Sequence, residues 1–566
     1  MPRSINRFAL WIITLNCLLI SLGASADNQT IHHRMKIILT PATSELQVTD
    51  HIRIPAQALN QNGSTTLDFS LHGGLTITDV QGARITAQKN VESSNSGHVP
   101  LKHYTLTLAS QQTELTVHYQ GKINHAVQNP GEEYARSFSY TPGVISNDGV
   151  FLANSSRWYP QFDDALVSFQ LTIEVPSDWN VVSQGTLVNE QKIATNQTVV
   201  WEETQPQDDI YIVAGRYHRY TQSTGAVNAL VYLRSADDAL AQKYLDTTAQ
   251  YIGMYNKLLG PYPYTKFALV ENFWETGYGM PSFTLLGPKV IRFPFILHSS
   301  YPHEILHNYW GNGVFVDYAK GNWAEGLTAY LADHLVNEQR GKGEEYRRDV
   351  LQKYADFVSK EKDFPLIRFV SRHSASSEAI GYGKTMMFFH MLRQELGDET
   401  FVKALRQLYK QFKFKQATFD DVQAAFSTMS GKDFARHFDR WVRQAGAPNL
   451  VLRQAEVEKQ PHGYKLKAQI EQTQPGEPYE LTVPVFVSLE REEWATRSDV
   501  KINQKTQIVE MDFPARPVRI DIDPQFDLFR RLDDRENPSA LSQGFGAQKP
   551  LLVLPANADP SLLQAY

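Results

Sequence analysis

The sequence predicts a multidomain α+β protein with an N-terminal antiparallel β domain, a mostly helical domain and a C-terminal β-sandwich. Two observations support this prediction. The spacing of apolar residues changes from strand-like to helix-like near Ser235 and returns to strand-like after Asn449. The 566 residues, 42% of them hydrophobic and 20% charged, are enough for several globular domains. We place the three domains at 27–217, 218–446 and 447–530, with a tail at 531–566.

Residues 1–26 have the pattern of a secretory signal peptide. Two arginines precede an apolar stretch at 8–22, and Ala24–Ala26 is a small-residue cleavage pattern. We therefore expect a periplasmic or extracellular protein without a stable membrane anchor after cleavage; an uncleaved N-terminal anchor is the alternative. Cys17 is the one cysteine of the chain, which excludes an internal disulfide and a zinc site made of thiolates.

Short strand-like runs characterise the N-terminal domain, and they are separated by turn-rich stretches such as Asn60–Gly63. Similar runs return in the C-terminal domain, where they predict a small β-sandwich. The clearest runs are 35–39, 115–119, 167–173, 464–470 and 481–487, with one more at 551–554 in the tail.

Capping residues and breakers mark the helices of the middle domain. Ser235 is the predicted N-cap of a long helix with acids in its first turn, which Gly260–Pro261 ends. Thr418–Asp421 resembles a capping box, and another helix is expected to end at Gly446.

The charge balance excludes one large class of partner. Lys and Arg number 55 against 61 Asp and Glu, which gives a net charge of −6. No basic field is available for a phosphate backbone, so we expect no nucleic-acid partner.

The segment His303–His307 reads H-E-x-x-H and predicts a metal site on a helix. Ser299 or Ser300 can cap this helix. Residues four apart lie on one helix face, so both imidazoles can meet one ion. Glu304 is placed to take a proton from a water that the metal activates. The alternative is a helix with two half-buried histidines.

Glu325 is the predicted third ligand, since catalytic zinc takes three protein ligands and leaves one position open. It follows Asn322, which can cap a second helix. The 17 residues between His307 and Glu325 suffice to end one helix and start an antiparallel one. The sequence therefore predicts one Zn²⁺ held by His303, His307 and Glu325; an ordinary surface glutamate is the alternative reading of Glu325.

These motifs resemble peptidase family M1, the aminopeptidase N-like gluzincins. His303–Asn312 reads H-E-I-L-H-N-Y-W-G-N, close to the family's H-E-L-x-H-Q-W-F-G-N. Trp323–Gly326 resembles W-L-N-E-G, with a spacer one residue shorter. Gly260–Lys266 resembles G-x-P-Y-P-x-x-K, and Trp441–Gly446 resembles W-x-x-Q-x-G. The resemblance implies a saddle-like N-terminal β domain, a thermolysin-like catalytic domain and a β-sandwich.

Tyr382–Lys384 corresponds to the family's Y-x-K-G, with Thr385 in place of the glycine. The resemblance implies that Tyr382 stabilises the tetrahedral oxyanion. A phenol stays protonated at neutral pH and can donate to a developing negative charge.

The active-site strand departs from the family pattern. Gly277–Ser282 reads G-Y-G-M-P-S where the family has G-A-M-E-N, whose glutamate holds the α-amino group of the substrate. Gly279, Met280 and Pro281 are still expected to bind an extended peptide as an added strand. Glu271 and Glu275 could replace the missing glutamate, or they could be solvated acids.

The sequence thus predicts an exported zinc metallopeptidase, aminopeptidase-like, that hydrolyses peptide substrates. Two alternatives stay open. One is an endopeptidase or another zinc hydrolase on the same scaffold, and the other is a non-catalytic zinc-binding protein of this fold. The sequence leaves the oligomeric state and the side-chain preference open.

Overall fold

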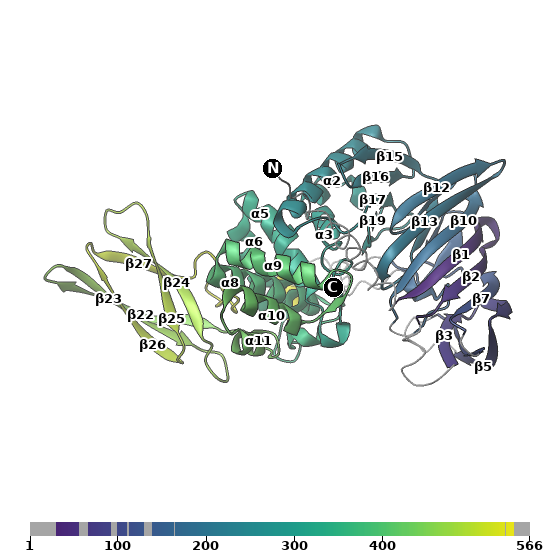
Figure 1. The fold of residues 1–566 in the computed structure, drawn as a ribbon. Coiled ribbons are helices and arrows are strands. Elements are labelled where there is room, and N and C mark those ends of the chain that lie inside the picture. Colours follow the sequence, from purple (N-terminus) through teal and green to yellow (C-terminus); the bar gives the residue numbers. More distant parts are fainter. Residues whose placement is uncertain are drawn as a thin grey trace, which may run out of the picture. The chain divides into compact units, whose positions relative to one another are not determined.

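A computed structural model describes residues 30–55, 66–91, 99–109, 112–128, 139–162, 165–537 and 539–547. These residues form two compact units. The first consists of residues up to Phe293 without Gln250–Pro263, and the second of Gln250–Pro263 and the residues from Pro294 onward (Figure 1). The predicted signal peptide, Cys17, the Asn60–Gly63 turn and the run at 551–554 lie outside the described residues.

Three β-sheets make up the N-terminal part of the first unit, with the orders β12-β13-β10-β1-β2-β7-β4, β11-β14-β9-β8 and β3-β6-β5. The strands are β1 (Ile31–Thr40), β2 (Glu45–Arg53), β3 (Thr66–His72), β4 (Leu75–Gln81), β5 (Ala83–Val91), β6 (Leu101–Leu108), β7 (Glu114–Lys122), β8 (Val144–Ser146), β9 (Gly149–Leu152), β10 (Val167–Pro176), β11 (Asn180–Val182), β12 (Thr186–Ile193), β13 (Asn196–Gln207) and β14 (Ile212–Gly215).

The prediction of an antiparallel domain is wrong for one pair of strands. β1 and β10 pair in parallel, although both neighbours of this pair, β2 and β13, are antiparallel to it. A parallel pair needs a long crossover connection, and the local apolar spacing carries no information about that.

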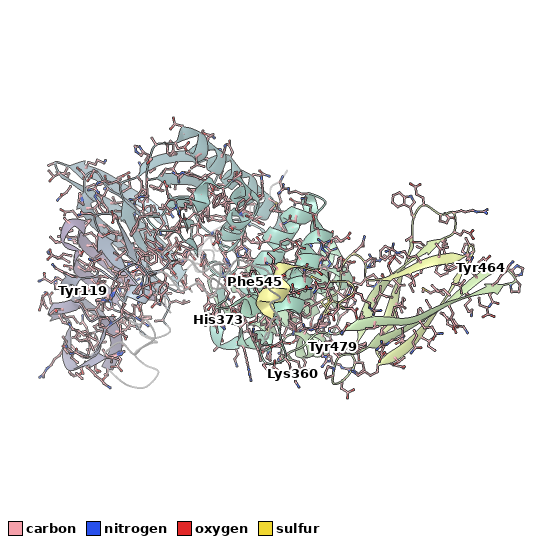
Figure 2. All side chains as sticks on the ribbon, turned by 180° about the vertical axis from the view of Figure 1, so that it is seen from behind. Tyr119, Lys360, His373, Tyr464, Tyr479 and Phe545 are labelled. Atoms are coloured by element: carbon pink, nitrogen blue, oxygen red, sulfur yellow. The ribbon has the colours of Figure 1, made fainter. Side chains whose placement is uncertain are left out.

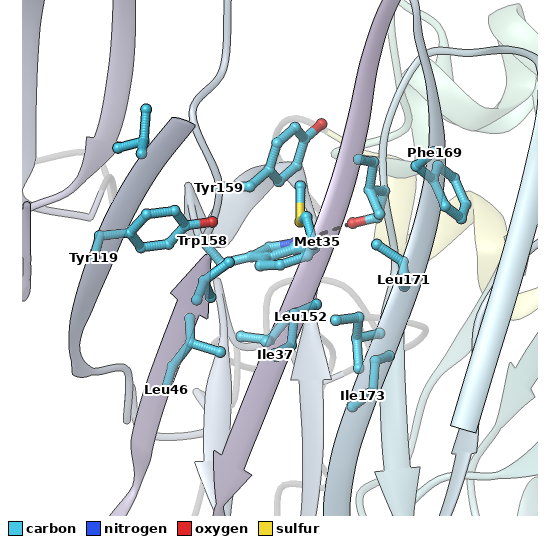
Figure 3. Packing of buried hydrophobic residues seen from close by; sticks show 14 of the residues in the cluster. Met35, Ile37, Leu46, Tyr119, Leu152, Trp158, Tyr159, Phe169, Leu171 and Ile173 are labelled. Carbon is cyan, nitrogen blue, oxygen red and sulfur yellow. Dashed lines mark hydrogen bonds between the residues drawn. The ribbon is translucent and has the colours of Figure 1, made fainter. Parts of the chain in front are cut away.

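Alternation along β1 shows why this segment forms a strand. Met35, Ile37 and Leu39 are buried, whereas Lys36 and Ile38 between them are exposed. Figure 3 shows Met35 and Ile37 among buried residues that include Trp158. A period of two places the apolar side chains of a strand on one face, so β1 covers the core of the N-terminal sheets.

A mixed sheet completes the first unit, in the order β15-β16-β17-β19-β18. Its strands are β15 (His218–Ser223), β16 (Asn228–Leu233), β17 (Lys266–Glu271), β18 (Gly277–Met280) and β19 (Phe283–Leu286). β16, β17 and β19 run parallel, and β18 returns antiparallel to β19. β18 is therefore an edge strand of this sheet within the part of the chain that the structure describes.

Most of the helices belong to the second unit. Those between Pro294 and Trp441 are η4 (Pro294–His298), α3 (Ser300–Leu306), η5 (Tyr318–Lys320), α4 (Ala324–Ala329), η6 (Tyr330–His334), α5 (Leu335–Gln339), α6 (Gly343–Phe357), η7 (Leu366–Arg368), α7 (Ala375–Glu378), η8 (Ala379–Lys384), α8 (Thr385–Leu396), α9 (Asp398–Phe412), α10 (Phe419–Ser430) and α11 (Ala435–Trp441). The capping box at the start of α10 is confirmed, because Thr418 Oγ1 accepts a hydrogen bond from the Asp421 amide at 3.3 Å.

Two predicted helix ends are wrong. The long helix α2 (Asp238–Leu259) is capped by Asp237, whose Oδ1 accepts from the Leu240 amide at 2.9 Å, and not by Ser235. The helix before Pro448 ends at Trp441, five residues before the predicted end at Gly446, whose φ is 101°. The carbonyl of Gly446 also accepts from the Lys384 ammonium at 3.1 Å, a contact that local sequence does not reveal.

The C-terminal part is a β-sandwich of two three-stranded sheets, β22-β23-β26 and β25-β24-β27. Its strands are β22 (Leu450–Gln460), β23 (Gly463–Gln472), β24 (Leu481–Leu489), β25 (Thr496–Ile502), β26 (Thr506–Phe513) and β27 (Pro517–Ile522). Figure 2 labels Tyr464 on β23 and Tyr479, whose ring lies 5.0 Å from that of Trp441.

The described part of the tail contains one short helix, α12 (Leu541–Gly546), which carries the exposed Phe545 (Figure 2). In the described part of the chain, no helix has both the length and the apolar character needed to span a bilayer. The domain boundaries at residues 217, 446 and 530 stay predictions.

Candidate metal centre and active site

The three predicted metal ligands converge in the second unit. His303 and His307 lie one turn apart at the end of α3, and Glu325 lies in the first turn of α4. One ligand atom from each lies within 4.8 Å of the others. Glu325 Oε2 is 3.5 Å from Nε2 of His303 and 3.3 Å from Nε2 of His307. The helical spacing of the motif and the turn between the two helices thus bring these side chains to one point.

The other ring nitrogen of each histidine is engaged by the protein. Nδ1 of His303 lies 3.0 Å from Asp333 Oδ2, and Nδ1 of His307 lies 3.0 Å from the Trp310 carbonyl oxygen. Both acceptors favour the tautomer with the proton on Nδ1. Each Nε2 therefore keeps its lone pair for the common point, an arrangement typical of metal-binding histidines.

The donor set fits zinc. Glu325 Oε2 is buried and has no hydrogen-bond partner among the described residues. Two imidazole nitrogens and one carboxylate oxygen form the three-ligand set of a catalytic zinc site, which leaves a fourth position open. An orphaned buried carboxylate oxygen that faces two imidazole lone pairs is costly without a cation between them.

Local structure explains why Glu325 points to the histidines. The side-chain oxygen of Asn322 accepts hydrogen bonds from the amides of Ala324 and Glu325 at 3.2 and 3.4 Å, so the predicted cap of the second helix is confirmed. A Cβ at Gly326 would overlap the Cβ of Thr385. The glycine after Glu325 therefore lets α4 pack closely against the start of α8.

The pKa values of the two glutamates of the site, Glu325 and Glu304, are shifted in opposite directions. Burial acts to raise the pKa of Glu325, but His307 and His303 outweigh it and hold this pKa well below its ordinary value. Burial raises the pKa of Glu304, and the two histidines offset this only in part. Glu325 is thus a ligand-like carboxylate, whereas Glu304 has a raised proton affinity that suits a general base.

Tyr382 lies beside this cluster. Its ring centroid is 6.2 Å from that of His303. Burial, followed by the nearby Glu325 carboxylate, raises the pKa of Tyr382 well above its ordinary value, so the phenol keeps its proton. A Cβ at Gly381 would overlap the Phe369 ring, so this glycine allows the close packing that places the tyrosine.

Two π-helical turns lie at the site. η6 continues α4 and carries Asp333, and η8 lies between α7 and α8 and carries Tyr382. Such turns change the direction in which helical side chains point and often occur at functional sites. Both side chains next to His303 therefore come from irregular helical turns.

The predicted substrate residues lie in the other unit. Gly279 and Met280 are in the edge strand β18, and Pro281 follows it. Their role in peptide binding stays a prediction. Both acids that could replace the family's glutamate have partners within their own unit. Glu271 pairs with Arg292 at 2.7 Å and accepts from the Arg234 amide, and Glu275 accepts from the Lys289 amide at 3.0 Å.

Sequence reasoning missed Asp333 and Arg372. Asp333 is eight residues after Glu325, in the π-helical turn η6, and no sequence motif marked it. Arg372 lies in a loop, with its guanidinium carbon 5.6 Å from the centroid of the Tyr382 ring. No pattern in the sequence marked this loop.

Comparisons with known proteins agree with this geometry. Residues 298–441 match the Peptidase family M1 domain. The chain is 22% identical to aminopeptidase 2, mitochondrial, of Saccharomyces cerevisiae over 387 residues, which is 64% of this chain and 40% of that protein. It is 20% identical to the alanine/arginine aminopeptidase of the same yeast over 72% of this chain and 50% of that protein. The chain thus spans half or less of the length of these relatives.

A solved structure shares the fold. Legionella pneumophila aminopeptidase A in complex with aspartic acid superposes with a TM-score of 0.68 at 16% identity, over 92% of this chain and 61% of that chain. The predicted multidomain α+β fold is confirmed by this likeness.

Proposed function

The chain belongs to peptidase family M1, and from this premise we propose that it is an exported zinc metallopeptidase that hydrolyses peptide bonds, with aminopeptidase-like activity. The observation that carries the proposal is the convergence of His303, His307 and Glu325 beside Glu304 and Tyr382. The signal-peptide pattern at residues 1–26 supports a periplasmic or extracellular location.

Each residue has a stated role. His303, His307 and Glu325 hold one zinc ion, which when bound supplies Lewis-acid polarisation of the scissile carbonyl and acidifies a water molecule. Glu304 accepts the proton of the attacking water and passes it to the leaving amine, and its raised pKa favours the first of these transfers. Tyr382 donates a hydrogen bond to the developing oxyanion.

The test joins metal analysis to peptide hydrolysis. Purified protein is expected to contain about one zinc per chain. A chelator should abolish hydrolysis of short peptides, and added zinc should restore it. Glu304→Gln is expected to lower kcat by about 10²–10⁴-fold with zinc retained. Glu345→Gln, on the exposed side of α6, is the control for loss of a carboxylate. A fully active Glu304→Gln protein would contradict the proposal.

A second candidate is an endopeptidase on the same scaffold. Pro281 and Ser282 stand where the family has glutamate and asparagine, and the nearby Glu271 and Glu275 are engaged by Arg292 and Lys289. No described residue of β18 thus supplies a carboxylate for a free α-amino group. Hydrolysis of matched free and N-acetylated peptides decides between the two: equal rates on both favour the endopeptidase.

A further inference from the structure

Arg372 is a positive charge next to the metal centre that the proposed mechanism does not use. It lies in the loop between η7 and α7, beside His373, which Figure 2 labels. Its guanidinium carbon lies 5.6 Å from the centre of the Tyr382 ring, and that ring lies 6.2 Å from the ring of His303. One aromatic side chain thus contacts both the guanidinium and the metal-ligand cluster.

Within the part of the chain that the structure describes, this guanidinium has no acidic partner. Among the described residues Arg372 makes no hydrogen bond and no ion pair, and it is only half exposed. Two other arginines of this unit pair with acids: Arg347 with Asp527 at 3.0 Å and Arg393 with Glu338 at 2.8 Å. The half-buried Arg440 and Arg531 have no acid but donate to backbone carbonyls, each at 3.0 Å. A guanidinium that is partly removed from water and has no carboxylate is a binding position for one.

The charge also acts on the reacting groups. Burial dominates the raised pKa values of Glu304 and Tyr382, and Arg372 lowers both in part. The field of Arg372 therefore reaches the two side chains that face the scissile bond in the proposed mechanism. A substrate placed there lies within the influence of this cation.

We propose that Arg372 forms a subsite for a carboxylate of the peptide substrate, so that the enzyme prefers peptides with a negative charge close to the scissile bond. The inference rests on the proposed peptidase function. A peptide can supply this carboxylate in two ways, as the side chain of Asp or Glu or as the free C-terminus of a short peptide. The planar guanidinium binds either carboxylate with two parallel hydrogen bonds.

Kinetics on matched peptides tests the subsite. One arm compares short peptides with a free C-terminal carboxylate and their C-terminal amides, and the other compares Asp and Asn at the residues flanking the cleaved bond. We expect wild-type kcat/KM to be about 10–100-fold higher for the carboxylate member of at least one pair, the usual worth of a charged hydrogen bond. Arg372→Gln should remove this preference, and Arg372→Lys should keep part of it. Arg368→Gln, an exposed arginine of η7, is the matched control.

The outcomes separate the alternatives. Equal wild-type rates within both pairs would overturn the inference. An Arg372→Gln variant that slows all peptides by the same factor would also overturn it, because Arg372 would then act by holding the Tyr382 ring.

A binding measurement keeps the subsite testable apart from catalysis. Zinc-loaded Glu304→Gln protein should bind the carboxylate peptide about 10-fold or more tightly than its neutral partner. The double variant with Arg372→Gln should bind both alike. A preference in this assay without turnover by the wild type would support the subsite and contradict the peptidase function.

Discussion

Two carboxylates with buried oxygens, Glu325 in the second unit and Asp209 in the first, have pKa values shifted in opposite directions. Glu325 faces two imidazoles, which hold its pKa well below the ordinary value despite burial. Burial raises the pKa of Asp209 to about 8, and the neighbouring Asp208 adds to this shift. Asp209 accepts from the Asn154 and Ile210 amides at 2.5 and 2.7 Å.

The difference lies in how the oxygens are used. Asp209 also accepts from the Tyr159 hydroxyl at 3.2 Å, so donors of its own fold occupy both of its oxygens. Glu325 Oε2 has no hydrogen-bond partner among the described residues and lies 3.5 Å from Nε2 of His303 and 3.3 Å from Nε2 of His307. Burial alone therefore does not identify a functional carboxylate. A functional carboxylate is indicated where several acceptor atoms converge on one point, since only a cation can satisfy all of them.

After Glu304→Gln, the largest expected effect is that of a change beside Glu325. Tyr382→Phe removes the phenol that would donate to the oxyanion, and it should lower kcat by about 10²–10³-fold. Zinc content and KM should change little, because the hydroxyl is not a ligand. Steady-state kinetics with metal analysis measures this. Tyr464→Phe in the β-sandwich is the control, and an unchanged kcat for Tyr382→Phe would remove this tyrosine from the mechanism.

The next effect concerns the support of one ligand. Asp333→Asn weakens the hydrogen bond that fixes Nδ1 of His303, 3.0 Å away, and zinc affinity should fall by about 10–100-fold. Competition with a chelator of known affinity measures the change. Asp209→Asn should leave zinc affinity unaltered. If both variants bind zinc as tightly as the wild type does, Asp333 does not support a zinc ligand and does not differ in this respect from the structural carboxylate Asp209.

The sequence predicted the parts of the site that follow from helical spacing. His303, His307 and Glu325 were found because a motif with spacing four lies on one helix face and a capped helix follows. Asp333 was missed because it reaches His303 from the π-helical turn η6, and the hydrogen-bond shift that makes such a turn leaves no clear mark in the sequence. Arg372 was missed because its place depends on a loop between two helical segments.

For the fold, too, the sequence predicted local features but not those that depend on distant parts of the chain. Strands such as β1 and β10 were predicted from their apolar alternation, but their parallel pairing was not, since it joins segments far apart in the chain. The end of α11 was placed at Gly446, whereas the helix stops at Trp441 and the segment that follows is held by contacts such as the hydrogen bond from Lys384 to the Gly446 carbonyl. Local patterns specify elements, whereas tertiary contacts decide how they pair and where they stop.

A smaller effect is expected from Asp209 itself, in stability as a function of pH. Its pKa is about 8 in the folded protein and near the ordinary 3.8 in the unfolded chain. The folded state therefore binds more protons between these values, and the free energy of unfolding should fall as pH rises through this window, by up to about 1.4 kcal/mol per pH unit. In Asp209→Asn this contribution is absent. Thermal unfolding of both proteins at pH 5 and pH 8 measures it, and identical pH dependence would contradict the raised pKa.

The smallest effect is expected at Lys266, which lies in the same unit as Asp209. Its contribution to stability should change with pH in the opposite direction to that of Asp209. Burial lowers the pKa of this lysine to about 7, with Glu203 opposing the shift, and its ammonium donates to Ser282 Oγ at 2.7 Å. The unfolded chain therefore binds more protons between pH 7 and the ordinary 10.5, and this residue's contribution to stability should rise with pH there.

Lys266→Met should remove that rise, while Asp209→Asn removes a fall at lower pH. Because Met also loses the hydrogen bonds to Ser282, the pH slope and not the absolute stability is the quantity to compare. Unfolding of wild type and both variants between pH 5 and pH 9 gives the slopes. We expect the two substitutions to change the pH slope of stability in opposite directions, because burial disfavours the negative charge of Asp209 and the positive charge of Lys266. Slopes that change in the same direction would mean that other titrating groups dominate.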